Sequence, residues 1–205
     1  LYILLLYVSS LGAQTDAIKK HLERIEELRD LSWNKELEFE SRINYAKQAV
    51  ALSKKVNIDS IFLKTNERLT TVYLEDHRYH KLAKKILDKN LKLSNSQKDS
   101  ISTAYISSQL GYLFHFSRVD NDSAYYYYYN SLKYLNNRPS HRILQTSILY
   151  VIASLQADEL DYTGSQLTNI QAINLLLDSP KSKSNQESLS DAYRLMGMNL
   201  RKLKE

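Results

Sequence analysis

The chain has 205 residues, a formal net charge of +5 and no cysteine. Without cysteine, disulfides and thiolate metal sites are excluded. Its four glycines and two prolines fall well below the roughly 14 and 10 of average usage, which favours long helices over sheets with tight turns. The positive charge is spread over mixed-sign segments, so we expect no nucleic acid to bind this segment directly.

The first residues are typical of a secretory signal peptide. An apolar run, Leu1–Val8, precedes small residues that end at Ala13, and polar Gln14 follows. We therefore interpret residues 1–13 as a signal-peptide remnant and 14–205 as one helical repeat domain. The alternative is a buried first helix. The apolar run is shorter than the about 20 residues that span a bilayer. Neither end shows a start or stop signal, so we expect more chain on both sides.

Apolar residues recur with a spacing near 3.6 in successive segments, which predicts helices. Asp122 or Ser123 is the expected N-cap of the sixth helix, and Trp33 is expected to be a packing anchor. No stretch alternates as a strand would, and no long linker divides the chain, so the fold class is all-α. The expected helices cover residues 16–31, 36–56, 60–75, 79–93, 96–117, 123–135, 141–157, 162–177 and 188–205.

The helices repeat in pairs. Thr70, Gly111, Ala153 and Gly197 mark the centres of alternate helices, at intervals of 41, 42 and 44 residues. A near-constant period built from two helices predicts a solenoid, because one hairpin cannot bury its own apolar face and needs its neighbours. Gly111 is expected to face Ala124 where two helices cross closely.

The pattern within each pair resembles the tetratricopeptide repeat (TPR). Leu110-Gly111 and Phe114 match the first helix of that motif, and Ala124 and Tyr128 match the second. The early tryptophan of the motif is absent, and the period exceeds the usual 34 residues. The resemblance implies a right-handed superhelical solenoid of TPR-like antiparallel helix pairs.

The signal-like start and the tyrosine-rich repeats together are similar to the exported N-terminal sensor region of bacterial TPR-containing signal-transduction regulators. This likeness implies a periplasmic or membrane-anchored protein, with the repeats outside the cytoplasm and a membrane span after Glu205. The alternative is a cytoplasmic helical scaffold or a nucleic-acid-associated helical module.

In the resembling family, the first helix of each pair lines a concave groove that binds a protein or peptide. Tyrosine and serine suit an extended peptide, because they combine rigid contact area with adaptable hydrogen bonds. The residues that the resemblance places in the groove are Lys64, Glu67, Thr71, Tyr105, Ser108, Tyr112, His115, Ser147, Tyr150 and Ser154.

No catalytic set is evident. The chain has neither a nucleophile elbow nor a glycine-rich phosphate loop, so we expect no enzyme activity, cofactor or metal. The competing hypothesis is a helical enzyme or metalloprotein that uses Glu75, His77 and His80. Residues 120–123 resemble a calcium loop but lack its glycine and distal glutamate, so a helix cap explains them better.

Tyr125–Tyr129 is a run of five tyrosines. Successive helical residues point about 100° apart, so the five rings cannot form one flat patch. We expect two or three of them to be buried between repeats, and the others could form an aromatic contact surface.

Overall fold

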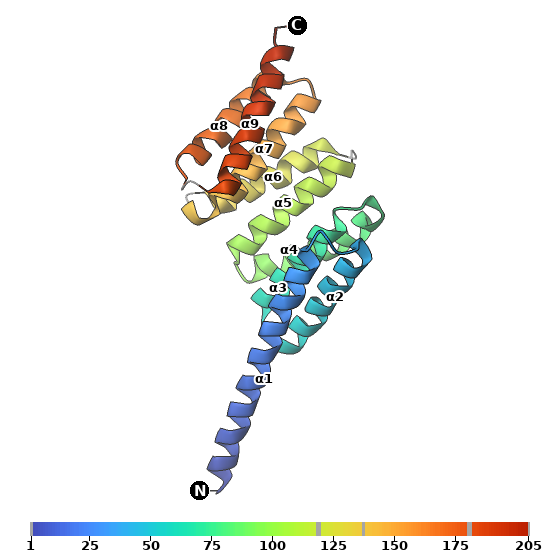
Figure 1. Ribbon diagram of the computed structural model, residues 1–205, viewed down its shortest axis with the longest axis vertical. Helices are drawn as coiled ribbons and strands as arrows, with labels where there is room; N and C mark the ends of the chain where they lie inside the picture. The colour runs from blue at the N-terminus through green and yellow to red at the C-terminus, as the bar shows by residue number, and fades with distance from the viewer. Residues whose placement is uncertain (1, 118–119, 137, 180–181, 205) are drawn as a thin grey trace. The chain divides into compact units, whose positions relative to one another are not determined.

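The computed structural model describes residues 2–117, 120–136, 138–179 and 182–204, with side chains described from Thr15 onward except that of Ser184. The described part holds no strand, so the prediction of an all-α fold is confirmed. Its elements, labelled in Figure 1, are α1(Tyr2–Trp33), α2(Phe39–Val56), α3(Asp59–Tyr73), η1(His77–Tyr79), α4(His80–Ser96), α5(Ser100–Ser117), α6(Asn121–Leu135), η2(Pro139–His141), α7(Arg142–Asp158), α8(Tyr162–Leu177) and α9(Lys183–Lys202).

The chain divides into two compact units. Unit 1 is Leu1–Ser102 and contains α1 to α4 and the first turn of α5. Unit 2 is Thr103–Glu205 and contains the rest of α5 and the later helices. The side chains of the expected signal segment lie outside the described residues, so that prediction stays open. Within the part that the structure describes, no helix combines the length and apolar character needed to cross a membrane.

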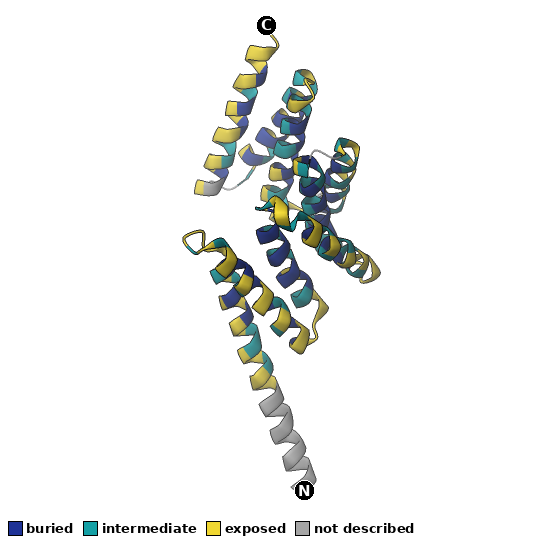
Figure 2. Cartoon of the chain, turned by 90° about the vertical axis from the view of Figure 1, so that its right-hand side faces the viewer, coloured by how far each residue is buried: buried dark blue, intermediate teal, exposed yellow. Residues whose placement is uncertain are grey.

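In unit 1, each helix packs on the next, and α1 also contacts α3. The core residues come from one face of each helix, and Figure 2 colours the buried positions of the ribbon dark blue. They include Ile25, Leu28, Ile43, Ala46, Ala49, Leu63, Leu69, Val72, Ala83 and Leu87. Burying each large aliphatic side chain contributes about 1.5–3 kcal/mol, which is the main force holding these helices together.

An ion pair in which Arg42 is buried joins α1, α2 and the turn after α3 in unit 1. The side chain of Arg42 is 4% exposed, and both of its terminal nitrogens donate to Glu75, at 2.8 Å each. Its Nε donates to the Ser32 carbonyl at 3.0 Å. Lys35 Nζ reaches Glu75 at 2.6 Å. The guanidinium lowers the pKa of Glu75, because its hydrogen bonds favour the carboxylate.

In unit 2, α6 packs on α7, and α8 packs on both α7 and α9. The hairpin of α5 and α6 closes most tightly at Gly111. A methyl group added there would lie 2.5 Å from Cδ1 of Tyr128, whose side chain is 1% exposed. The expected partner of Gly111 was Ala124. Ala124 is buried, but the aromatic ring one turn further along α6 takes the close position.

Small polar residues line the helix seams. Ser131 Oγ donates to the Ala104 carbonyl at 2.7 Å and joins α6 to α5. Ser165 Oγ donates to the Ala153 carbonyl at 2.5 Å and accepts from Asn199 Nδ2 at 2.7 Å. These bonds satisfy polar groups that would be costly to bury alone, and the small side chains let the helix backbones approach each other.

The helix ends correct two expectations. The N-cap of α6 is Asp120, not Asp122 or Ser123, and its carboxylate accepts from Ser123 N at 3.0 Å. Helix α9 begins at Lys183, five residues before the predicted start, because the hydroxyl of Ser182 accepts from Asn185 N at 3.1 Å. A side chain that caps the free N–H groups fixes where each helix starts.

Three of the described helices end in a left-handed residue that is not glycine. Asn57 follows α2 with φ 56°. Lys98 follows α4 with φ 55°, and Leu160 follows α7 with φ 67°. At the end of α7, Asp161 N bonds the Gln156 carbonyl at 2.9 Å, and Leu160 N bonds the Ala157 carbonyl at 3.0 Å. This pair of bonds is the Schellman motif, whose left-handed position strains an ordinary L-residue.

Candidate functional site

The candidate site in unit 2 lies where α5 and α7 run side by side in the same direction. Near their N-terminal ends, the ring of Tyr105 on α5 lies 6.4 Å from the ring of His141, the η2 residue that directly precedes α7. At their C-terminal ends His115 Nε2 lies 3.9 Å from a carboxylate oxygen of Asp158. We call the surface between these two contacts the α5/α7 face.

The structure places the predicted groove residues of unit 2 along the α5/α7 face. On α5, Tyr105, Ser108 and Tyr112 are half-buried, and His115 is buried. On α7, Ser147 is exposed, while Tyr150 and Ser154 are half-buried. Their opposite neighbours Gly111 and Ala153 are buried, so the two helices do separate a packed side from a wetter side. That a ligand binds there stays a prediction.

The other three predicted groove residues belong to unit 1, on α3. Lys64 is exposed, and Glu67 and Thr71 are half-buried. The Thr71 hydroxyl donates to the Glu67 carbonyl at 2.8 Å. Burial raises the pKa of the Glu67 carboxyl, and the positive charges of Arg68, Arg29 and Lys64 oppose that shift. The ten predicted groove residues therefore belong to two units, three to unit 1 and seven to unit 2.

Trp33 is not the packing anchor that its position suggested. Its side chain is 51% exposed, and the guanidinium carbon of Arg68 lies 4.0 Å from the ring centroid. The arginine thus stacks on the indole in a cation–π contact that needs no burial.

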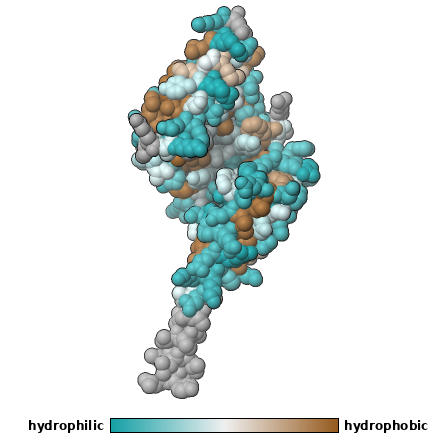
Figure 3. All heavy atoms as spheres, viewed as in Figure 1, coloured by the Kyte–Doolittle hydropathy of each residue, from teal (hydrophilic) through white to brown (hydrophobic). Residues whose placement is uncertain are grey.

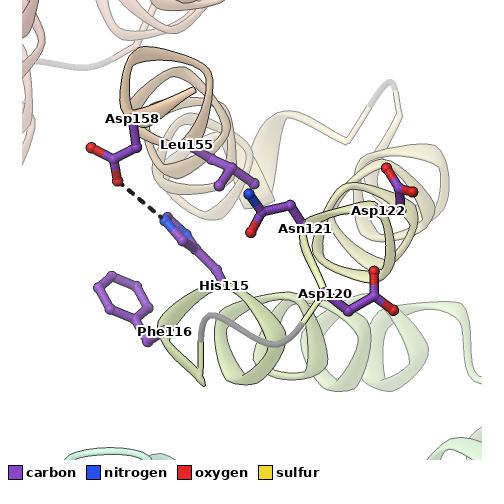
Figure 4. A pocket seen from close by; sticks show the side chains of 7 residues that line it. All are labelled: His115, Phe116, Asp120, Asn121, Asp122, Leu155 and Asp158. Atoms are coloured by element: carbon purple, nitrogen blue, oxygen red, sulfur yellow. Dashed lines mark ion pairs between the residues drawn. The ribbon is translucent and has the colours of Figure 1, made fainter. Parts of the chain in front are cut away.

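A hollow of about 690 Å³ lies at the C-terminal end of the α5/α7 face. Figure 4 shows the side chains around it, with the imidazole of His115 pointing toward Asp158. They come from the ends of α5 and α7 and the start of α6, and they are His115, Phe116, Asp120, Asn121, Asp122, Leu155 and Asp158. Three carboxylates, one imidazole and one exposed phenyl ring thus line a space open to solvent.

His115 is the buried titratable group of this hollow. Its side chain is 8% exposed, and its Nδ1 lies 3.4 Å from the Tyr128 hydroxyl. Burial lowers the pKa of the imidazole, while the carboxylates of Asp158 and Glu159 oppose that shift. The desolvation effect dominates, so the ring favours its neutral form near pH 7 and can both donate and accept a hydrogen bond.

Glu159 ties α6 to the end of α7 beside the hollow. Its two carboxylate oxygens accept from Asn121 Nδ2 at 2.6 Å and from the Tyr125 hydroxyl at 2.8 Å. Burial, followed by this hydrogen bond, raises the pKa of the Tyr125 phenol. These two bonds connect the start of α6 to the α7–α8 turn, so they brace one side of the hollow.

Sequence reasoning identified His115 but missed Phe116, Leu155 and Asp158 as lining residues. Asp158 lies one helical turn beyond Ser154, so extending the count along α7 by one turn would have reached it. The closeness of Asp158 to His115 has no sequence signal, because the two are 43 residues apart and meet only through packing.

Only one tyrosine of the run is buried, fewer than the two or three expected. Tyr128 is buried at 1% exposure, Tyr125 and Tyr127 are half-buried, and Tyr126 and Tyr129 are 66% and 52% exposed. The rings of Tyr126 and Tyr127 meet edge to face at 5.1 Å. The exposed pair lies on the outer side of α6, opposite the side that carries Ala124 and Tyr128.

The histidines near η1 belong to unit 1 and are not among the residues that line the hollow. His77 is exposed, with Nδ1 3.7 Å from Asp76, and His80 Nε2 lies 3.4 Å from the Leu74 carbonyl. Arg78 lowers the pKa of Asp76 to about 2 through its hydrogen bonds. Among the described side chains, no three His, Asp or Glu residues are grouped as metal ligands would be, so the geometry gives the metalloprotein hypothesis no support.

Comparisons with known proteins bear on the fold alone. No family model matches the sequence, and no curated protein matches it either. The fold is similar to the crystal structure of BtubC (BKLC) from P. vanneervenii, with a TM-score of 0.70. That similarity covers 91% of this chain and 83% of the other, at 14% sequence identity.

Proposed function

We propose that this chain is a non-catalytic TPR-like module that binds a protein or peptide along its odd-numbered helices. Two observations within the units support the helical-repeat part of the proposal. Helix α1 contacts both α2 and α3, and α7 contacts both α8 and α9. In stacked helix pairs, each first helix contacts the second helix of its own pair and the first helix of the following pair. Continued stacking of this kind yields a right-handed solenoid in TPR proteins.

The observation that carries the binding proposal is the α5/α7 face. Tyr112 and Tyr150 lie half-buried on adjacent helices, and the hollow of about 690 Å³ lies at the end of the same face. Half-buried tyrosines give a ligand rigid contact area at low entropic cost. The polar hollow offers carboxylates and a neutral imidazole as hydrogen-bonding partners for one anchoring side chain.

The direct test pans a displayed library of random peptides against the full chain. Peptides that the wild type enriches are then measured on two double variants. Tyr112→Ala with Tyr150→Ala removes the aromatic area of the α5/α7 face. The matched control, Tyr126→Ala with Tyr129→Ala, removes two exposed tyrosines from the outer side of α6. Circular dichroism establishes that each variant remains helical.

We expect the α5/α7 variant to lose at least tenfold in affinity, about 1.4 kcal/mol, and the control to keep the wild-type affinity. No enriched peptide, or a loss confined to the α6 control, would overturn the proposal.

We also propose that the module is exported and acts as the sensor or scaffold part of a bacterial signal-transduction protein. The support is the sequence of residues 1–13 together with the resemblance described above. A reporter enzyme that is active only outside the cytoplasm, fused after Glu205, tests this part. Activity that persists after residues 1–13 are deleted would contradict it.

A further inference from the structure

Helix α4 carries a straight row of lysines on its outer side. Lys81, Lys85, Lys89 and Lys92 are all exposed, and at 100° per residue they fall within an arc of about 80°. Along the axis they span about 16 Å, in steps of about one turn. The buried residues of α4, which are Ala83, Leu87, Asn90 and Ser94, lie on the opposite side of the helix. The row therefore points away from the core of unit 1.

The row has no local partners. No ion pair within 4 Å involves any of its four ammonium groups among the described residues. The single acidic residue of α4, Asp88, pairs with Lys84 at 2.8 Å. Five lysines and one aspartate give the helix a net charge of +4. Four like charges held one turn apart repel one another, and a row of negative charges would relieve that repulsion.

The second helices of the pairs in unit 2, α6 and α8, carry no such row of lysines. Helix α6 has one lysine and one aspartate, and α8 has no charged residue at all. A solvated outer surface therefore does not require such a row in this fold. The chain also has exposed lysines on α2, namely Lys47, Lys54 and Lys55, but they do not form a row at single-turn spacing.

We propose that the α4 lysine row docks an acidic helical segment of a partner protein. Carboxylates repeated at every third or fourth position of a helix have the same pitch as the row, so each can meet one ammonium group. The row has no arginine or aromatic residue, the types that grip phosphates bidentately or stack on bases, and this disfavours a nucleic acid. The row belongs to unit 1 and shares no residue with the α5/α7 face, so the inference does not rest on the function proposed there.

The test uses a synthetic alanine-based helical peptide of about 16 residues, with glutamates spaced to form one row. A second peptide of the same composition distributes its glutamates around the helix. Binding to the full chain is measured by fluorescence anisotropy at low salt and again near 0.15 M salt, where charges are screened beyond about 8 Å. We expect the row peptide to bind about tenfold more tightly than the scrambled one.

A matched pair of variants separates the row from general charge. One replaces Lys81, Lys85, Lys89 and Lys92 by glutamine. The control replaces four other exposed lysines of unit 1, which are Lys19, Lys47, Lys54 and Lys55. Both lose the same charge, but only the first should lose about tenfold in affinity for the row peptide.

Three results would overturn the inference: equal losses in both variants, equal binding of the two peptides, or tighter row-dependent binding of duplex DNA or anionic lipid vesicles. Circular dichroism of both variants excludes unfolding as the cause. Charge reversal adds an independent check. Lys85→Glu with Lys89→Glu should reject the row peptide and should bind a copy in which the facing glutamates are lysines.

Discussion

Gly111 on α5 and Gly197 on α9 mark the same place in the predicted repeat, yet they should respond to alanine in opposite ways. A methyl group at Gly111 would lie 2.5 and 2.7 Å from two ring carbons of Tyr128, whereas nothing lies within 4 Å of the same position at Gly197. We predict that Gly111→Ala destabilises the protein and that Gly197→Ala stabilises it.

The magnitudes follow from two opposing effects. Alanine gains up to about 1 kcal/mol over glycine in a helix interior, so Gly197→Ala should stabilise by about 0.5–1 kcal/mol. Carbon atoms normally pack about 3.5–4.0 Å apart, so at Gly111 the ring would have to move by about 1 Å. Tyr128 is 1% exposed, so other atoms surround its ring and must move with it. Overpacking of this kind costs about 1–3 kcal/mol, which leaves a net loss of about 1 kcal/mol.

Thermal unfolding followed by circular dichroism measures both changes on the full chain. At this size, 1 kcal/mol corresponds to about 2–4 °C in Tm, so the two variants should move in opposite directions by amounts that can be resolved. In a Tyr128→Ala background the ring is gone, and Gly111→Ala should no longer destabilise. Equal stabilisation by both alanines in the wild-type background would refute the packing of α5 on the Tyr128 ring.

Three further predictions concern a helix end and two titrating groups. Leu160→Gly should stabilise by about 1 kcal/mol, because Leu160 is 72% exposed and its φ of 67° strains an L-residue; the matched change Asn57→Gly should be nearly neutral in thermal unfolding, because asparagine tolerates this conformation. Glu75→Gln should destabilise by about 2 kcal/mol, since it leaves Arg42 buried without its carboxylate. The folded-state pKa of Glu75 is lowered from 4.5, so the wild type should lose this stabilisation as pH falls below about 4.5. If the free energies of unfolding of wild type and variant fell in parallel with pH, the prediction would be contradicted. The pKa of His115 is lowered from 6.5, so protonation of this imidazole opposes folding. Wild-type stability should therefore fall as pH drops below about 6.5, and the dependence of stability on pH should be weaker in His115→Gln. Urea unfolding across that pH range measures both.

Helix positions were the most predictable part of the fold. Apolar residues spaced near 3.6 and a polar turn at Asp161 gave the bounds of α8 as the structure has them, Tyr162–Leu177. The start of α6 was misplaced because residues 120–123 include several good capping types in a row, and the sequence does not say which one turns out of the helix. The start of α9 was missed because its first turn is polar and shows no apolar period.

The candidate site was only partly predictable. Counting around α5 found His115, but the hollow depends on the ends of α5 and α7 lying together, and no local pattern encodes that. The α4 lysine row was overlooked for a different reason. Along the chain, the lysines from Lys81 to Lys92 are interspersed with apolar residues and form no charged run. The helix places the two kinds of residue on opposite sides.

The hydroxyl of Ser165 also bears on the order in which the protein assembles. It gives its proton to the Ala153 carbonyl of α7 and receives one from Asn199 of α9. Helix α9 thus bonds to a hydroxyl that also joins α7 to α8. The last helix should therefore dock late and detach early, and its backbone amides should exchange with deuterium before those of α7 and α8. A single hydroxyl at a three-helix junction would thus set a sequence of events as well as a contact.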